Sequence, residues 1–436
     1  MTVAGAFGSF RLWLDQNLFP QAPKPPRITI RRAAIITGTA LLLVAVQLVR
    51  IHSSAPLNSL WAEDGYLFLA DALRWSFFHA LTTPYNGYLN TVSRLIAEPV
   101  SKLPVQWFAP AMAVAGAAIV TGCAFVVWRS SAGHIRSTAL RGVLVGVLVL
   151  PPVVGIEMLD DVTYSIWYLL FASFWVLLWR PSTLAGSFGA GVLLFLTAVS
   201  NALTVLLLPI WLLRLVAVRD HRDRVIVAAF AGGILTQYAL SWNQTDLLGE
   251  RGGYQYSQPA HWNWSLVPAY IQRIVGGVLT GQRINSYLWV HFSAGFELLL
   301  AGGLVLLVVG AMVSSRTAAR VLVPLMVALS AGMFLLSGYQ RQVGSQFYWS
   351  HGSSNVVGSH YVVVPTLLLL SALLLLLDVE TPHHRMYLRK ELRVGVIALV
   401  VVSAAASFSV VDASARGRPT WTQALARGRT QCVQST

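Results

Sequence analysis

Two adjacent carboxylates, Glu63 and Asp64, follow the first long apolar run of the chain and lie between Trp61 and Tyr66. Adjacent carboxylates repel each other, so one of them can keep a proton at an unusually high pH. Such a group is suited to act as a general base or to bind a divalent cation. Placing both acids beside a bilayer is costly unless they are paired, metal-bound or hydrated. A solvated acid pair beside interface aromatics is the alternative interpretation.

A second acidic cluster, Glu157, Asp160 and Asp161, lies between two apolar runs. On a helix, spacings of three and four would place Glu157 beside both of the other acids. Three carboxylates this close together would suit a divalent cation, Mg²⁺ or Mn²⁺, or would orient sugar hydroxyls. A plain solvated turn is the alternative.

Aromatic and polar residues accompany these acids in several segments. Aromatic faces stack on sugar rings and line apolar tails, but they also anchor proteins at membrane interfaces. A guanidinium binds phosphate bidentately, so a lone arginine near a span end could hold a substrate phosphate or contact a lipid headgroup. The candidate binding residues are Tyr66, Tyr88, Asn90, Arg94, Arg273, Arg341, His360 and Tyr361.

The elements that must position these residues are membrane-spanning helices. Hydrophobic residues make up 56% of the 436 residues and charged residues 11%, and the mean hydropathy is +0.62, whereas soluble proteins carry about 25% charged residues. This composition excludes a soluble domain and a disordered chain. A helix needs about 20 mainly apolar residues to cross a bilayer. We therefore predict an all-α, polytopic transmembrane helical bundle of about eleven spans, at 33–51, 107–128, 140–156, 165–179, 184–200, 202–217, 225–242, 291–313, 321–339, 361–377 and 394–412.

The basic residues predict the orientation in the cell membrane. With a cytoplasmic N-terminus, 19 of the 31 Lys and Arg residues fall in inner segments and 12 in outer segments, which is the positive-inside pattern. The cluster from Arg416 to Arg429 fits this pattern poorly. Ten of the 17 acids then lie outside, so we expect the functional site on the extracytoplasmic face.

This topology divides the chain into three predicted parts. Residues 1–32 form a cytoplasmic segment with an interfacial helix, and residues 33–412 form the multi-span membrane domain. The tail, 413–436, is predicted to be extracytoplasmic. The membrane domain carries large extracytoplasmic loops, with interfacial helices, at 52–106, 243–290 and 340–360.

Several classes of chemistry find no support in the sequence. It contains no Walker A loop, no Rossmann glycine fingerprint, no G-x-S-x-G elbow, no H-E-x-x-H and no C-x-x-C motif. It also contains no motif typical of nucleic-acid binding, and in a membrane protein the net charge of +14 fits topology and anionic lipid better than nucleic acid. Two cysteines exclude a disulfide framework.

These features together resemble the GT-C superfamily, the integral membrane glycosyltransferases that use polyprenyl-phosphate-linked sugars. In both, one span leads from a cytoplasmic N-terminus to a long outer loop with an acidic pair, here Glu63-Asp64. The loop continues with Gly87-Tyr88-Leu89 and Arg94-Leu95, which looks like actinobacterial members of the group. A late outer loop ends in His360-Tyr361, with Pro365 in the next span. Relatives often have Arg where this chain has His360.

The resemblance implies an inverting sugar transfer. Asp64 or Glu63 would take the proton from an acceptor hydroxyl, and the oxygen would attack the anomeric carbon and displace polyprenyl phosphate. Arg341, Arg273 or a divalent cation held by outer acids would balance the charge of the leaving phosphate. The acceptor would be a cell-wall glycan, a glycolipid or a protein. A transporter or flippase for a lipid-linked or small polar substrate is the main alternative, and a non-catalytic scaffold is a third.

Overall fold

The structure is a computed structural model and describes residues 3–21, 27–50, 56–60, 63–85, 87–153, 155, 158–159, 161–241, 262, 264–314, 316–341, 360–378, 386–409 and 419–435. Within these residues the secondary structure is helical, with two isolated β-bridges and no strand. The helices are α1 (Val3–Asn17), α2 (Ile30–Leu48), α3 (Ala70–Arg74), α4 (Phe77–Thr82), α5 (Thr91–Val100), α6 (Phe108–Ser130), α7 (Thr138–Val149), α8 (Ser165–Leu178), α9 (Leu184–Ala198), α10 (Leu208–Ala217), α11 (His221–Ser241), α12 (Leu266–Tyr270), α13 (Gly277–Met312), α14 (Thr317–Arg341), α15 (His360–Leu377), α16 (Met386–Ala406) and α17 (Trp421–Ser435). Short 3₁₀ and π segments join several of them.

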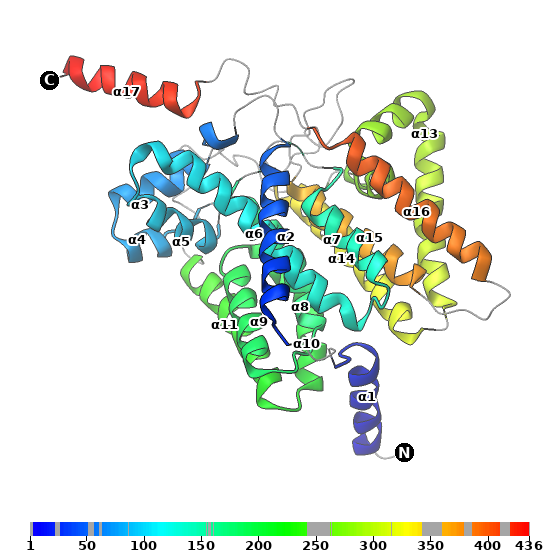
Figure 1. Ribbon diagram of the computed structural model, residues 1–436. Helices are drawn as coiled ribbons and strands as arrows, with labels where there is room; N and C mark the ends of the chain where they lie inside the picture. Colours follow the sequence, from blue (N-terminus) through cyan, green and yellow to red (C-terminus); the bar gives the residue numbers. More distant parts are fainter. Residues whose placement is uncertain are drawn as a thin grey trace.

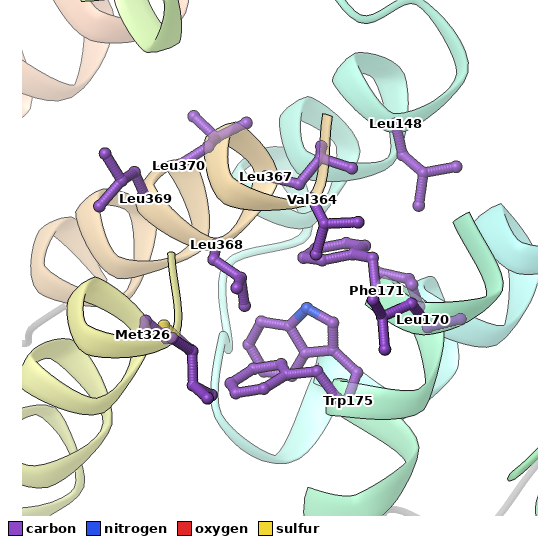
Figure 2. Close-up of a cluster of buried hydrophobic side chains, with 14 of the residues drawn as sticks. Leu148, Leu170, Phe171, Trp175, Met326, Val364, Leu367, Leu368, Leu369 and Leu370 are labelled. Carbon is purple, nitrogen blue, oxygen red and sulfur yellow. The ribbon is translucent and has the colours of Figure 1, made fainter. Parts of the chain in front are cut away.

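The centre of the bundle is formed by α8 and α15 (Figure 1). All 14 residues of α8 are buried, because the helix is apolar around its whole circumference and a helix of that kind must be surrounded by other helices. Trp175 is fully buried at the middle of this core, between side chains of α7, α14 and α15 (Figure 2). Figure 2 labels its neighbourhood: Leu148, Leu170, Phe171, Met326, Val364, Leu367, Leu368, Leu369 and Leu370.

The outer helices expose apolar side chains. In α2 only Gln47 is buried, while Leu41 is 66% exposed; in α13, Leu298 is 75% exposed. Large apolar side chains exposed along whole helices are typical of a surface that faces lipid.

Within the described residues, six helical segments are long and apolar enough to cross a membrane. They are Ile30–Leu48, Val105–Gly133, His221–Ser241, Gly295–Met312, Thr317–Tyr339 and His360–Leu377. Four further apolar segments, Thr138–Val149, Ser165–Leu178, Leu184–Ala198 and Ala202–Ala217, have between 10 and 17 residues. Each of the eleven predicted ranges overlaps a helix, so the architecture is that of a helical multi-pass membrane protein, while the count of eleven crossings stays a prediction.

One sequence prediction of helix extent was wrong. The range 140–156 was predicted as one span, but α7 ends at Val149, because Pro151 and Pro152 cannot continue a helix. The range 243–290 was predicted as an outer loop with interfacial helices, and the described part of its second half is helical. There α12, the π-helical segment Ile271–Gly276 and the first turns of α13 follow one another.

One end of the bundle, which we call the α1 end, is held together by buried ion pairs. Arg180 pairs with Asp15 of α1 at 2.8 Å and with Asp223 of α11 at 3.0 Å, and Arg214 of α10 pairs with the same Asp223 at 3.0 Å. Arg316 lies 3.4 Å from Asp378 on the same side of the bundle. All of these residues belong to segments predicted to be cytoplasmic.

The opposite end, which we call the α17 end, gathers the segments predicted to be extracytoplasmic. Arg50 donates to the carbonyl oxygens of Pro151 and Phe408 at 3.2 and 3.1 Å. Thr91 donates to Val199 at 2.9 Å, and Gln282 donates through its backbone to Pro152 at 3.0 Å. The segments predicted to be cytoplasmic thus lie at one end of the bundle, and those predicted to be extracytoplasmic lie at the other. Figure 1 shows α1 and α17 at opposite ends. Which end faces the cytoplasm stays a prediction.

Candidate functional site

Asp64 fastens the first predicted outer loop to the turn that leads into α8. One carboxylate oxygen accepts from the Thr163 backbone N–H at 3.0 Å and from its hydroxyl at 2.6 Å, and the other accepts from the Val162 N–H at 3.0 Å. The side chain is 1% exposed. Hydrogen bonds from backbone amides to a carboxylate are among the stronger ones in proteins, so this contact positions the start of α8.

Burial changes the protonation of this carboxyl. Burial, together with the charge of Glu63, raises the pKa of Asp64 from 3.8 to about 6. The three hydrogen bonds act in the opposite direction, because they favour the charged form. Burial and then the charges of Asp64 and Glu63 raise the pKa of Asp161 well above its ordinary value. We call Glu63, Asp64 and Asp161 the acid cluster. Because both pKa values are raised, Asp64 and Asp161 retain protons at a pH where isolated carboxyls are ionised.

The acid cluster has unused acceptor atoms. Oε2 of Glu63 and Oδ2 of Asp161 are buried and accept no hydrogen bond from the described residues. The predicted cation site also included Glu157 and Asp160, which lie outside the described residues. Within the described residues no group of three His, Cys, Asp or Glu side chains has the geometry of a metal site.

Glu63 is linked to the surface through two tyrosines. Tyr85 donates its hydroxyl to Glu63 Oε1 at 3.2 Å, and the hydroxyls of Tyr66 and Tyr85 lie 3.3 Å apart. Burial and the charge of Glu63 raise the pKa of the Tyr85 phenol, so it remains a donor. Tyr66 is 57% exposed, and the chain of groups therefore runs from the acid cluster to the exterior.

Asn90 and Arg94 contact other parts of the protein. Asn90 has a left-handed backbone with φ of 50°, and its Oδ1 accepts from the Ser93 hydroxyl at 2.9 Å. Arg94 pairs with Asp71 at 2.9 Å and donates to the Leu89 carbonyl at 3.0 Å. Both side chains are buried, so these contacts hold α5 and do not present the two residues to a ligand.

A cavity of about 130 Å³ lies at the α17 end, beside the first turn of α8. His360 stacks on Tyr164 with ring centres 4.5 Å apart, and Trp167 meets Tyr361 edge-on at 5.4 Å. The wall contains no Asp, Glu, Lys or Arg among the described residues. Its residues are Tyr88, Tyr164, Ile166, Trp167, Asn201, Ala202, Leu203, Val205, Tyr238, Leu336, Ser337, His360 and Tyr361.

Asn201 provides a polar group in this wall. Its Oδ1 accepts from the Leu203 backbone N–H at 3.0 Å, which fixes the side chain. Its Nδ2 is buried and has no hydrogen-bond partner among the described residues, and the residue is 4% exposed. Because an unpaired buried amide is costly, Nδ2 is a donor available to a bound polar molecule or to water.

Two short connections join the acid cluster to the cavity wall. Thr163, which binds Asp64, directly precedes Tyr164 of the wall. Tyr85, which binds Glu63, pairs through its backbone with Tyr88 of the wall, at 2.8 and 3.2 Å. Neither Glu63 nor Asp64 lines the cavity itself, so the acids and the cavity are neighbouring parts of one region.

The other five predicted binding residues divide into three groups. Tyr88, His360 and Tyr361 line the cavity. Arg273 is 1% exposed and is not among the residues that line the cavity. Arg341 ends α14, one helical turn beyond Ser337 of the wall, and its side chain lies outside the described residues.

Five polar or aromatic residues of the cavity wall were not among the candidate binding residues: Tyr164, Trp167, Asn201, Tyr238 and Ser337. Their common signal is a polar or aromatic residue within or at the end of an apolar run, as for Asn201 between two predicted spans. The same pattern occurs at interface anchors, so it does not identify a cavity without coordinates.

No protein-family model matches the chain, and no curated protein or solved structure is similar enough to match it.

Proposed function

We propose that the protein is an integral membrane glycosyltransferase of GT-C type. It would move a sugar from a polyprenyl-phosphate donor to an extracytoplasmic glycan, glycolipid or protein, with inversion at the anomeric carbon. The observation that supports this function best is the aromatic, uncharged cavity connected to the buried acid cluster. Aromatic faces with a few fixed polar groups are suited to bind a sugar ring.

The size and location of the cavity support a small cyclic ligand. A cavity of about 150 Å³ holds one benzene molecule, so the present space is on the scale of a single ring. The Nδ2 of Asn201, which has no hydrogen-bond partner among the described residues, is a donor available on its wall.

Glu63 is the better candidate for the catalytic base. A base needs an oxygen that can reach the acceptor hydroxyl. Both oxygens of Asp64 are engaged by the turn at Val162 and Thr163, whereas Oε2 of Glu63 accepts no hydrogen bond from the described residues. We therefore assign proton removal to Glu63 and positioning of the α8 turn to Asp64.

In the proposed reaction, Glu63 accepts the proton of the acceptor hydroxyl, and the hydroxyl oxygen of the acceptor forms a bond to the anomeric carbon. The bond from that carbon to the phosphate oxygen breaks, and polyprenyl phosphate leaves with the electron pair. Phosphate is a good leaving group, so no acid is obligatory. Arg341, one helical turn from the cavity wall, is the candidate cation for the leaving phosphate.

The test is sugar transfer in membranes that contain the full-length protein, with radiolabelled polyprenyl-phosphate-linked mannose and arabinose as donors. We expect Glu63→Gln to reduce transfer about 10²–10⁴-fold at normal expression. Glu98→Gln is the matched control, because Glu98 lies in the same predicted loop and pairs with the exposed Lys102 at 3.1 Å.

Two results would overturn the proposal. Full activity of Glu63→Gln would exclude it as the base. Absence of transfer from the donors by the wild-type protein, with movement of a lipid-linked sugar across vesicle membranes, would establish the transporter or flippase alternative.

A further inference from the structure

We propose that α17 is a membrane-surface helix that binds the anionic headgroups of phospholipids at the α17 end. The helix comprises Trp421–Ser435. Residues 413–436 contain four arginines and no Asp or Glu. This role is independent of the sugar transfer proposed above.

The first turn of α17 is fixed at the end of a candidate membrane span. Trp421 donates its indole N–H to the Val105 carbonyl at 2.9 Å and stacks on Phe108, with ring centres 6.2 Å apart. Thr422 and Asn58 exchange hydrogen bonds of 2.9 and 3.0 Å. Because Val105–Gly133 is a candidate span, these contacts place the start of α17 at the level of a membrane boundary.

Neighbouring side chains have the character of a membrane interface. Leu103 is 44%, Val105 38% and Trp107 57% exposed, and exposed tryptophan beside a span end is typical of the headgroup region. Figure 1 shows α17 projecting from the bundle at this level and running across the direction of α2, not along it.

The positions along α17 form the pattern of an in-plane helix. At about 100° per residue, Trp421, Leu425 and Gly428 fall on one side of the helix. Arg427 and Arg429 fall on its two flanks, and both are exposed. An apolar side bordered by basic residues lets a helix lie in the interface, with its cationic ends reaching headgroup phosphates.

Charge complementarity selects the partner. No carboxylate of the described residues pairs with Arg427 or Arg429. Basic residues are usually retained on the cytoplasmic side, so this cluster is the exception to the orientation that the rest of the chain predicts. A guanidinium binds phosphate bidentately, and an anionic phospholipid surface would stabilise the cluster where it lies.

The experiment follows the depth of α17 in full-length protein in nanodiscs. A spin label is attached at Gly428→Cys, an exposed position on the Trp421 side of the helix where an added Cβ would meet nothing within 4 Å. The background is Cys123→Ala, Cys432→Ser, and the label's access to a water-soluble nickel chelate is compared with its access to oxygen. One set of discs contains phosphatidylcholine alone, and the other also contains 30% phosphatidylglycerol as the anionic probe. An unchanged thermal transition verifies that each variant is folded.

We expect the label to move to headgroup depth in the phosphatidylglycerol discs and to return toward water at high salt. Each arginine near an anionic surface favours association about fivefold, so Arg427→Gln, Arg429→Gln should shift the population about 25-fold toward water. Arg427→Lys, Arg429→Lys should retain the shift. A label equally exposed to water in both lipids, or a depth unaffected by the glutamine substitutions, would overturn the proposal.

Discussion

At the scale of single residues, the acid cluster positions a turn of the chain and contains two carboxyls, Asp64 and Asp161, with raised pKa values. Asp64 holds the turn before α8 through three hydrogen bonds, while burial shifts its proton equilibrium. Glu63 and Asp161 keep buried oxygens that accept nothing from the described residues. Adjacent carboxyls in the chain are therefore placed in different environments, which is a common way to give two acids different roles.

The raised pKa of Asp64 makes stability depend on pH. Between about pH 4 and pH 6 the folded protein retains a proton that the unfolded chain has lost, because the pKa rises from 3.8 to about 6 on folding. The free energy of unfolding should therefore fall as the pH rises through this window. Thermal unfolding in detergent at a series of pH values measures it.

Asp64→Asn is the corresponding variant. It should flatten the pH dependence in this window and lower stability at pH 7 by about 1–3 kcal/mol, because an amide cannot accept from both Val162 and Thr163. A pH dependence identical to that of the wild type would contradict the assignment.

Sequence reasoning located the acids but not their roles. The sequence shows Glu63 and Asp64 as adjacent carboxylates. Their interaction with Asp161, which lies 97 residues after Asp64, appears only in the folded protein. Asn201 carries no signal beyond a polar residue between apolar runs. Its value to the site lies in an unpaired buried atom, which only packing can reveal.

At the scale of elements, the turn that carries Asp161 is pressed against α6. A Cβ added at Gly116 would lie 2.9 Å from three backbone atoms of Asp161. The absence of a side chain at Gly116 therefore allows α6 to approach the acid cluster closely.

Gly116→Ala should displace this turn and lower stability by about 1–3 kcal/mol, with a loss of any transfer activity. Gly122→Ala in the same helix is the matched control, because its Cβ would meet nothing within 4 Å. Melting of both variants in detergent checks the expectation. Equal behaviour of the two alanine variants would show that the close approach does not matter.

The helices themselves were largely predictable, because apolar runs must become helices in a membrane. The range 165–179 matches α8, Ser165–Leu178, almost residue for residue. Interfacial helices were predicted in the outer loops without their bounds. Because residues 277–290 mix polar and aromatic side chains, the sequence did not show that they continue into the predicted span as the first half of α13. Apolarity also fails to distinguish a helix that crosses the bilayer from a short helix enclosed by the bundle. The helix α8 is an example, because it is apolar around its circumference and all of its 14 residues are buried.

At the scale of the whole molecule, the division into two ends makes the orientation testable. Phe78, at the α17 end, is 74% exposed, and His221, at the α1 end, is also exposed. Because both positions are exposed, cysteines placed there should differ in labelling only because the membrane blocks access of the reagent to one of them.

With a membrane-impermeant maleimide on intact cells, Phe78→Cys should be labelled and His221→Cys should be labelled only after permeabilisation. The background is Cys123→Ala, Cys432→Ser. Labelling of His221→Cys in intact cells would reverse the predicted orientation and would place the acid cluster on the cytoplasmic side.

The ion pairs at the α1 end have a consequence for how the protein is made. Arg180 joins Asp15, which the ribosome delivers 165 residues earlier, to Asp223, which follows 43 residues later. Newly made helices can enter the bilayer one after another, but α1 cannot be fastened until Arg180 has been synthesised, and the junction closes only when α11 begins. Docking of the N-terminus is thus a late step of biogenesis, and nascent chains stopped before Asp223 would leave Arg180 and Arg214 without that carboxylate.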